Sequence, residues 1–305
     1  MESRGGFFQM LEFKPMDLSD IGKIKHYFEY SANRTCDNTV GGAFMWRNYF
    51  SVEYAEYNET IIFKTKVVYS NNLTAFTLPL GKDVMGGINK IVEYCHAMGM
   101  PLSFCTITSD EIDLLETVFP DFTIYKELNW SDYIYNVNDL KTLSGRKYNG
   151  QRNHINAFYR ENTDISFEVI TADNLQQVID FYAQISGHID DHDPLSLEEH
   201  SKTFEVLENF EQYGLYGGLL RTEGQIVAFS VAESLRNVIF VHIEKADTRF
   251  RGAYQVINKE LINHFATDEI EFVNREEDVG DEGLRYSKRS YHPSEMIDKY
   301  LFLVR

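Results

Sequence analysis

Residues 237–265, NVIFVHIEKADTRFRGAYQVINKELINHF, constrain the fold of this chain more than any other stretch. They begin with a β-branched and aromatic run, residues 238–243, which is short enough for a buried central strand. After Gly252, apolar residues recur at helical spacing, at Tyr254, Ile257, Leu261 and Phe265. The pattern therefore predicts a buried strand, a turn and an amphipathic helix, in that order.

The turn between this strand and helix is basic and contains glycine. Its candidate ligand-binding residues are Lys245, Arg249, Arg251, Gly252 and Ala253. A helix start presents unpaired N–H groups and a partial positive charge, and glycine lets a ligand approach the backbone closely. Guanidinium groups bind phosphate well. We therefore expect a phosphate-bearing ligand at this turn.

The composition is that of a globular protein. The chain has 305 residues, of which 43% are hydrophobic and 14% aromatic, so it is long enough for two domains. No apolar run approaches the ~18 residues that span a bilayer, and residues 1–10 resemble a loose leader rather than a secretory signal. Cys36, Cys95 and Cys105 form no metal-ligand pattern. We expect a reduced, cytoplasmic protein without a bound metal.

The net charge of −18 argues against broad binding to nucleic acid. Residues 141–160 are nevertheless basic and contain no Asp or Glu. The candidate binding residues of this segment are Arg146, Lys147, Arg152 and Asn153. Either they face an anionic ligand, such as phosphate, CoA adenosine or a tRNA acceptor end, or they are the solvated charges of a linker.

The order of the predicted elements repeats along the chain. Each half is predicted to contain a strand, a helical region, three antiparallel strands, a helix, a strand, a helix and a strand. In the first half, residues 18–30 are predicted to form one helix. In the second half, a capping box at Ser196 predicts a helix start, Glu223 and Gly224 predict the turn of a hairpin, and residues 299–304 are the expected closing strand. We therefore expect an N-terminal domain at 11–138, a basic connection at 139–160 and a C-terminal domain at 161–305.

This order, with a basic glycine turn between the fourth strand and the next helix, resembles the GCN5-related N-acetyltransferase fold. In that superfamily an Arg/Gln-x-x-Gly-x-Gly/Ala turn binds the pyrophosphate of acetyl-CoA. Here Arg249 and Gly252 match its first arginine and first glycine, and Tyr254 stands where the last small residue is expected. The resemblance implies that Tyr254 belongs to the donor-binding turn.

Four longer segments, residues 143–158, 242–247, 252–258 and 274–293, carry a more specific resemblance. They look like an uncharacterised bacterial family related to the C-terminal catalytic domain of phosphatidylglycerol lysyltransferases. The resemblance runs from residue 13 to the C-terminus. It implies an α/β (α+β) fold with two tandem acetyltransferase-like domains, whose mixed, mostly antiparallel sheets are flanked by helices.

In the lysyltransferases such a pair of domains moves an amino acid from aminoacyl-tRNA to a lipid headgroup. The resemblance thus implies an acyl or aminoacyl transferase with no tightly bound cofactor and with acyl-CoA or aminoacyl-tRNA as co-substrate. The acceptor would be an amine or hydroxyl of a small molecule or headgroup-like compound. The alternative is a non-catalytic protein that binds a ligand in the same crevice. The equivalent turn of the first half, residues 78–83, has no arginine, so we interpret that half as degenerate.

Acyl transfer to an amine needs a group that accepts a proton and a group that donates one. Glu244, at the end of the central strand, and Glu276, after the next strand, are the candidate bases. Glu244 alternatively pairs with Lys245 or Arg249. In acetyltransferases a tyrosine of the last region often protonates the leaving group, and the resemblance favours Tyr291 over Tyr286.

The polar run at residues 274–278 follows a predicted strand, at the end where ligand crevices open. Either it contacts substrate or it is a solvated acidic turn. The candidate substrate- or phosphate-binding residues here are Asn274, Arg275, Arg285 and Lys288. Arg285 and Lys288 are three apart, so one helix face would present both to a phosphate.

Two further features leave alternatives open. The loop at residues 188–193 holds two histidines among aspartates, which favours either a metal site or a polar loop that faces substrate. Cys36 lies in a polar stretch without a visible partner base, so the sequence gives little support for a nucleophile there.

Overall fold

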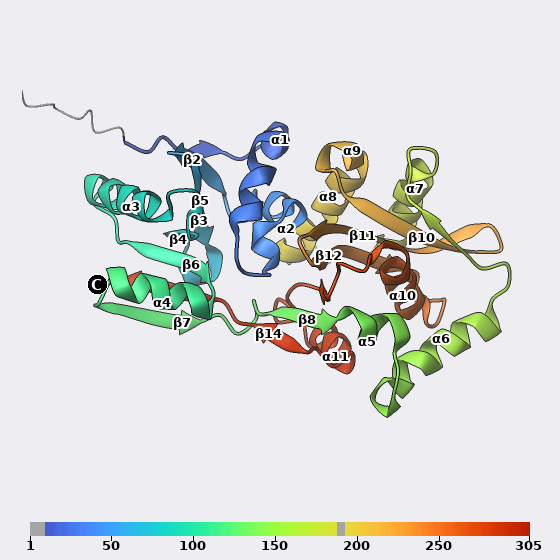
Figure 1. Cartoon of the computed structure of the whole chain (residues 1–305). Coiled ribbons are helices and arrows are strands. Elements are labelled where there is room, and N and C mark those ends of the chain that lie inside the picture. Colours follow the sequence, from blue (N-terminus) through green and yellow to red (C-terminus); the bar gives the residue numbers. More distant parts are fainter. Residues whose placement is uncertain (1–9, 188–192) are drawn as a thin grey trace, which may run out of the picture. The chain divides into compact units, whose positions relative to one another are not determined.

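The computed structural model describes residues 10–187 and 193–305, which form two compact units (Figure 1). The first unit contains the described residues up to Ala32, Phe50–Glu127 and Lys299–Arg305, and the second contains Asn33–Tyr49 and Leu128–Asp298. Nearly all of the predicted leader, residues 1–10, and of the 188–193 loop lies outside the described residues.

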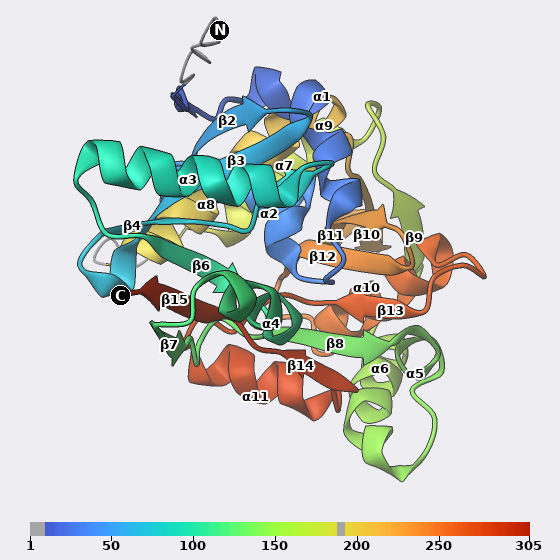
Figure 2. The ribbon, with the colours of Figure 1, turned by 60° about the vertical axis from the view of Figure 1, so that its left-hand side comes forward.

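The sheet of the first unit has the strand order β1-β2-β3-β4-β6-β15-β7, with β5 paired to β3. The strands are β1 (Lys14–Pro15), β2 (Glu53–Tyr57), β3 (Thr60–Val67), β4 (Leu73–Phe76), β5 (Leu80–Gly81), β6 (Ser103–Ile107), β7 (Phe122–Lys126) and β15 (Tyr300–Val304). The helical elements are η1 (Leu18–Asp20), α1 (Ile21–Ile24), η2 (Lys25–Tyr30), η4 (Val68–Ser70), α3 (Val84–Met98) and α4 (Ser109–Val118). Helices α3 and α4 pack on the strands through a shared core around Phe76, Phe104 and Phe302 (Figure 2).

The sheet of the second unit has the order β14-β8-β13-β12-β11-β10-β9. Its strands are β8 (Asp132–Asn136), β9 (Ser166–Val169), β10 (Tyr216–Thr222), β11 (Gln225–Leu235), β12 (Val238–Ala246), β13 (Phe272–Asn274) and β14 (Glu295–Ile297). Its helical elements are η3 (Cys36–Asn38), α2 (Val40–Met45), α5 (Val137–Thr142), η5 (Arg146–Tyr148), α6 (Asn149–Glu161), α7 (Leu175–Ile185), α8 (Pro194–Glu208), α9 (Phe210–Tyr213), α10 (Ala253–Phe265) and α11 (Glu282–Ser290).

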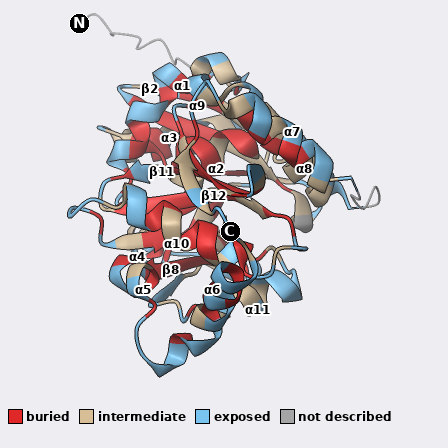
Figure 3. Ribbon diagram, turned by 90° about the vertical axis from the view of Figure 1, so that its right-hand side faces the viewer, coloured by how far each residue is buried: buried red, intermediate tan, exposed pale blue. Residues whose placement is uncertain are grey.

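Strands β11 and β12 form the buried centre of the second unit (Figure 3). Helix α10 packs against β10, β11 and β12 through one apolar cluster that includes Val241 and Ile257. On β11, Phe229 contacts Phe181 and Tyr182 of α7 instead. Residues 238–241 of β12 are all buried, and consecutive side chains of a strand point to opposite faces, so this strand is apolar on both faces there, as its sequence predicts.

Each sheet contains one strand from the other half of the sequence. Strand β8 lies between β13 and β14, and β15 lies between β6 and β7. The expected closing strand at 299–304 exists, but it belongs to the first unit, and residues 33–49 belong to the second. The predicted domain boundaries are corrected accordingly. Local sequence patterns do not predict this exchange of β8 and β15 between the two sheets. The exchange depends on apolar partners far away in sequence, such as the stacked rings of Phe302 and Phe122.

Most predictions made from local sequence patterns are confirmed. The hairpin turn at Glu223 and Gly224 has positive φ angles of 50° and 77°, as tight hairpins require. Two local predictions are corrected. Helix α8 begins at Pro194, with Asp193 as its cap, so Ser196 lies inside the helix. The single helix expected at residues 18–30 is divided among η1, α1 and η2.

Candidate functional site

The predicted donor turn leads into α10. Gly252 stands at the helix start with a φ of +90°, and no side chain caps the helix there. A Cβ on Gly252 would lie 2.2 Å from the carbonyl oxygen of His154 in α6. The glycine is thus needed for the close packing of α6, whether or not a ligand also approaches it.

The basic side chains of this turn are partly paired. The Arg249 guanidinium bonds to Asp247 at 2.6 Å through Nη2, although its side chain is 83% exposed. Lys245 pairs with Glu199 at 2.6 Å. Arg251 and Tyr254 are exposed, and Ala253 is buried in the helix packing. Because Arg249 and Arg251 are exposed beside an uncapped helix start, an anion can approach this surface.

In the corresponding turn of the first unit, the charged side chains bond to groups of the same unit. The carboxylate of Asp83 accepts a hydrogen bond of 2.9 Å from the backbone N–H of Gly86, in the first turn of α3. Lys82 pairs with Glu59 at 2.5 Å. A carboxylate thus occupies the position that a ligand anion would take. The interpretation of the first half as degenerate stays a prediction.

The central strands diverge next to the turn. Strands β12 and β13 pair in parallel only from Val238↔Phe272 to Phe240↔Asn274. Beyond this point a register shift in the β11–β12 pairing leaves His242 without a cross-strand partner. Such a bulge redirects side chains and is common beside active sites. The polar run after β13 begins at this divergence, as the sequence predicts.

Arg275 organises the first polar cluster. Its Nη2 donates to Glu244 at 2.9 Å, and the other Glu244 oxygen accepts from Asn258 of α10 at 2.8 Å. The guanidinium lies 4.8 Å from the ring centre of Tyr291. Burial raises the pKa of Tyr291, although the Arg275 charge opposes this. Among the described residues the buried Nη1 of Arg275 has no hydrogen-bond partner.

Glu276 belongs to a second cluster. Its Oε1 is 2.7 Å from Nδ1 of His242, and Nε2 of His242 is 2.8 Å from Oε1 of Glu233. Burial alone would lower the pKa of His242, but the two carboxylates outweigh it and raise the pKa to about 10. Burial raises the pKa of Glu276, although His242 opposes the shift. Glu276 also has a left-handed φ of 56°, a conformation that is uncommon for a non-glycine residue.

Glu277 and Asn274 belong to a third cluster with Cys36 and Asp132. The Cys36 thiol lies 3.3 Å from Oε1 of Glu277, and its backbone N–H donates to Asp132 at 2.7 Å. Asn274 donates to the same Asp132 oxygen at 2.6 Å. The buried ammonium of Lys288 donates to the backbone carbonyl of Glu277. The cluster therefore contains its own cation.

Asp278 ends the polar run in a fourth set of contacts. It accepts from Arg285 at 2.7 Å and from the hydroxyl of Tyr133 at 2.6 Å. Lys288 is only 6% exposed and faces Glu277 instead. The expectation that Arg285 and Lys288 meet one phosphate is corrected, because burial and different partners hold them apart.

The basic segment at residues 141–160 is mainly engaged within the protein. Lys147 pairs with Asp139 at 3.1 Å, and Arg152 donates to the carbonyl of Gly145 at 2.8 Å. Arg146 and Asn153 are exposed. These contacts agree with the linker alternative for Lys147 and Arg152.

The sequence did not identify His242, Glu233, Asp132 and Asn258 as site residues. A histidine inside an otherwise apolar strand was the available signal for His242. The partners of Cys36 come from distant parts of the chain, so no local sequence pattern predicts them.

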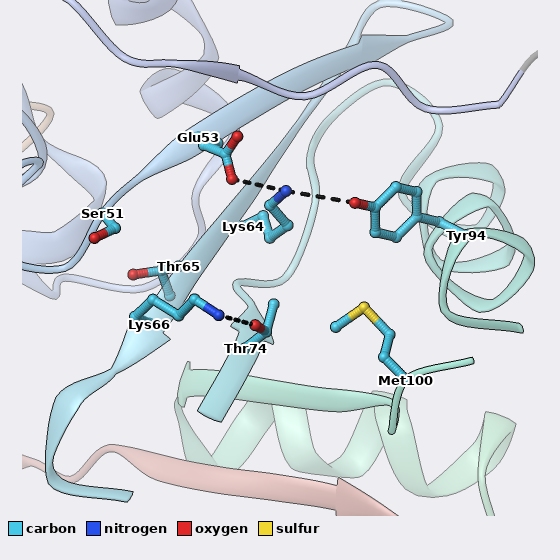
Figure 4. A pocket seen from close by; sticks show the side chains of 8 residues that line it. All are labelled: Ser51, Glu53, Lys64, Thr65, Lys66, Thr74, Tyr94 and Met100. Carbon is cyan, nitrogen blue, oxygen red and sulfur yellow. Dashed lines mark hydrogen bonds and ion pairs between the residues drawn. The ribbon is translucent and has the colours of Figure 1, made fainter. Parts of the chain in front are cut away.

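A separate hollow lies on the sheet of the first unit, between β3, β4 and α3 (Figure 4). Lys64 in this hollow pairs with Glu53 at 2.7 Å, and Lys66 donates to the Thr74 hydroxyl at 2.5 Å. The hollow shares no residue with the four clusters of the second unit.

Comparison with known proteins identifies relatives. The profile of the family described as "Phosphatidylglycerol lysyltransferase, C-terminal" matches residues 28–303. A conserved protein of unknown function from Bacteroides thetaiotaomicron is 31% identical, with a TM-score of 0.87 over 97% of this chain and 100% of that one. L-PGS from Bacillus licheniformis is 17% identical, with a TM-score of 0.61 over 92% and 91% of the two chains. FemX is 8% identical, with a TM-score of 0.61 over 96% and 97%.

These likenesses and the two sheets confirm the predicted α/β (α+β) fold class, with two domains whose mixed sheets are flanked by helices. The predicted relation to the lysyltransferase catalytic domain is confirmed as well. Within residues 10–187 and 193–305, no helix combines the length and the apolar character that crossing a membrane requires.

Proposed function

Because this chain belongs to the phosphatidylglycerol lysyltransferase C-terminal family, we propose that it transfers an aminoacyl group from aminoacyl-tRNA to an amine or hydroxyl acceptor. In this reaction the acceptor attacks the ester carbonyl of the charged tRNA. The new bond to the carbonyl carbon forms, and the ester C–O bond breaks. The acceptor loses a proton and the leaving ribose oxygen gains one.

The buried guanidinium of Arg275 is the observation that best supports this proposal. Glu244 holds Nη2, while Nη1 is buried and has no partner among the described residues. Native proteins rarely leave such a donor unsatisfied without a functional reason. A guanidinium fixed in this way is suited to stabilise the oxyanion that develops on the ester carbonyl.

The other candidate residues divide the remaining tasks. Both oxygens of Glu244 are already bonded, so in this proposal it orients Arg275 rather than accepting a proton. Glu276 accepts the proton of the acceptor, since a raised pKa brings a carboxylate closer to the working pH of a general base. Tyr291 keeps its proton when buried and donates it to the leaving oxygen.

For the donor, we favour aminoacyl-tRNA over a CoA thioester. The family relationship supports the tRNA, and Gly252 packs against the backbone of His154, which takes the space that a pyrophosphate would need to approach this glycine. The exposed Arg249 and Arg251 suit a phosphate of a tRNA acceptor end. The acceptor belongs to the same proposal, with a headgroup-like hydroxyl or a small amine as the two classes to test.

The test is a transfer assay with the full chain. Purified protein is incubated with a pool of radiolabelled aminoacyl-tRNAs and either phosphatidylglycerol vesicles or a mixture of small amines. Loss of label from tRNA and the mass of the aminoacylated product are measured, and parallel reactions contain acetyl-CoA. The variants are Arg275→Met and, as a matched control, Arg160→Gln, whose side chain is 66% exposed on α6.

We expect transfer from tRNA, a loss of about 100-fold or more in Arg275→Met and no change in Arg160→Gln. Consumption of acetyl-CoA with aminoacyl-tRNA left intact would contradict the proposed donor. Wild-type rates in Arg275→Met would remove the proposed oxyanion site. Binding of charged tRNA without any turnover would instead favour the non-catalytic alternative.

A further inference from the structure

A continuous chain of hydrogen bonds runs from α2 to the loop after β13. The backbone N–H groups of Val40 and Gly41 donate to Glu233, at 3.2 and 2.6 Å. Glu233 faces one ring nitrogen of His242, and Glu276 faces the other. The imidazole is fully buried. A Cβ on Gly41 would come within 2.3 Å of the ring, so α2 lies directly against it.

The geometry favours a doubly protonated His242. Each ring nitrogen lies within hydrogen-bond distance of a carboxyl oxygen, and an ionised carboxylate can only accept a proton. When Glu233 and Glu276 are both ionised, both nitrogens carry a proton and the ring is an imidazolium between two anions. Such a ring has no lone pair with which to act as a base, so its task in this site is to hold its neighbours.

The two carboxylates are held differently. Both oxygens of Glu233 accept backbone N–H groups, and Oε1 also faces His242. Glu276 uses Oε1 towards His242, and among the described residues nothing bonds its Oε2. The Glu276 side chain is 16% exposed. One oxygen of Glu276 is thus fixed and the other is free to receive a proton.

We propose that His242 is a positioning residue, which Glu233 and the first turn of α2 lock in place so that it presents Oε2 of Glu276 to the acceptor. This inference rests on the proposed function and deepens it. The acceptor proton passes to Oε2 as the new bond to the carbonyl carbon forms, and Tyr291 protonates the leaving ribose oxygen. The proton on Glu276 then restores Tyr291 through solvent, so the step balances without a further reactant.

Other charges that act on Glu276 come from two elements. Glu277, the next residue, raises its pKa, and Lys288 of α11 lowers it together with His242. Removing the imidazolium therefore removes one of the two positive neighbours. The pKa of Glu276 should then rise further, and the acidic limb of the pH dependence of kcat/KM should move to higher pH.

Two substitutions separate position from charge. The amide nitrogen of Asn lies near the place of Nδ1, so His242→Asn keeps a donor towards Glu276. The amide of Gln reaches the place of Nε2, so His242→Gln keeps a donor towards Glu233 only. Both remove the charge. The control is His96→Gln, at an exposed histidine of α3 in the first unit.

The transfer assay is repeated across the pH range with these three variants. We expect both His242 variants to show the acidic limb at higher pH. We expect kcat/KM to fall by about 100-fold in His242→Gln and by clearly less in His242→Asn, with no change in His96→Gln. If wild type transfers and neither variant moves the acidic limb, this inference is overturned while the proposed function stands. If wild type transfers nothing, the proposed function fails and the role of Glu276 fails with it.

A measurement on the wild-type protein decides the matter if the variants do not fold. Long-range ¹H–¹⁵N spectra report the protonation of each imidazole nitrogen. We expect both nitrogens of His242 to stay protonated at pH 8, well above the ordinary range of histidine. A neutral ring at that pH would overturn the inference, because a neutral ring cannot donate to both carboxylates.

Discussion

Replacing Gly41 with alanine tests the contact between α2 and His242 most directly. The new Cβ would lie 2.3 Å from Cδ2 and 2.4 Å from Nε2 of the imidazole, distances that real Cβ atoms do not show. The ring is fully buried and bonded on both sides, so it has no free rotation with which to avoid the methyl group. Either α2 moves away from β12, or the ring leaves Glu233.

Each response breaks two hydrogen bonds to charged groups. If α2 moves, the backbone N–H groups of Val40 and Gly41 lose Glu233, at 3.2 and 2.6 Å. If the ring moves, His242 loses Glu233 and Glu276, at 2.8 and 2.7 Å. Hydrogen bonds to charged groups contribute roughly 1.5–3 kcal/mol each. Alanine gains up to about 1 kcal/mol over glycine inside a helix. We therefore expect Gly41→Ala to lower the free energy of unfolding of the second unit by about 3 kcal/mol.

Chemical denaturation and thermal melting of the full chain measure this change. A loss of about 3 kcal/mol lowers the melting temperature of a unit of this size by roughly 6–12 °C. The matched control is Gly150→Ala in α6, where nothing lies within 4 Å of the new Cβ, and we expect it to be neutral or slightly stabilising.

A double-mutant cycle identifies the cause. In a His242→Ala background the ring is absent, so we expect Gly41→Ala to cost little. An equal cost of Gly41→Ala in both backgrounds would refute the steric argument. The same result would also weaken the view that α2 locks His242.

Three further changes test other parts of the structure. Gly252→Ala should destabilise the protein clearly more than Gly145→Ala in urea unfolding, because both glycines have positive φ but only Gly252 faces a backbone carbonyl at 2.2 Å. Burial would raise the pKa of Glu205, but Arg47, Tyr213 and Lys202 lower it to about 2. The ionised Glu205 therefore stabilises the fold above the ordinary glutamate pKa of about 4.3, and this stabilisation is lost as the pH falls towards 2. Glu205→Gln should accordingly lose less stability than wild type between about pH 5 and pH 2.5. Asp83→Ala removes the cap of α3 and should cost about 1 kcal/mol in the same urea assay, and an unchanged midpoint would contradict the capping role.

The sequence predicts elements well where local chemistry decides them. The apolar run of β12, the glycine before α10 and the turn residues at Glu223 and Gly224 are signals that neighbouring residues fulfil on their own. The sheet to which a strand belongs is a different matter. The pattern of β15 shows that it is a strand, but its membership depends on the rings of Phe104 and Phe122, far away in sequence.

The candidate site shows the same difference between signals that are local in the sequence and partners that are distant in it. The run from Asn274 to Asp278 is visible in the sequence because five polar residues follow an apolar strand. Its partners are not visible, because consecutive residues point into separate clusters. Arg275 meets Glu244, Glu276 meets His242 and Glu277 meets Cys36. Only the packed structure decides which buried charge faces which partner.

The strand exchange makes the second half of the sequence dependent on the first. A fragment of residues 161–305 lacks β8, which pairs with both β13 and β14. It also lacks the buried rings of Tyr133 and Tyr135, and the α2 residues that bond Glu233. Leaving strand edges unpaired and removing core rings lowers the free energy of unfolding by more than the whole stability of a typical domain. We therefore expect this fragment to give the poorly dispersed amide spectrum of an unfolded chain. A well-dispersed spectrum would show that the second half folds by itself and that the exchanged strand is dispensable.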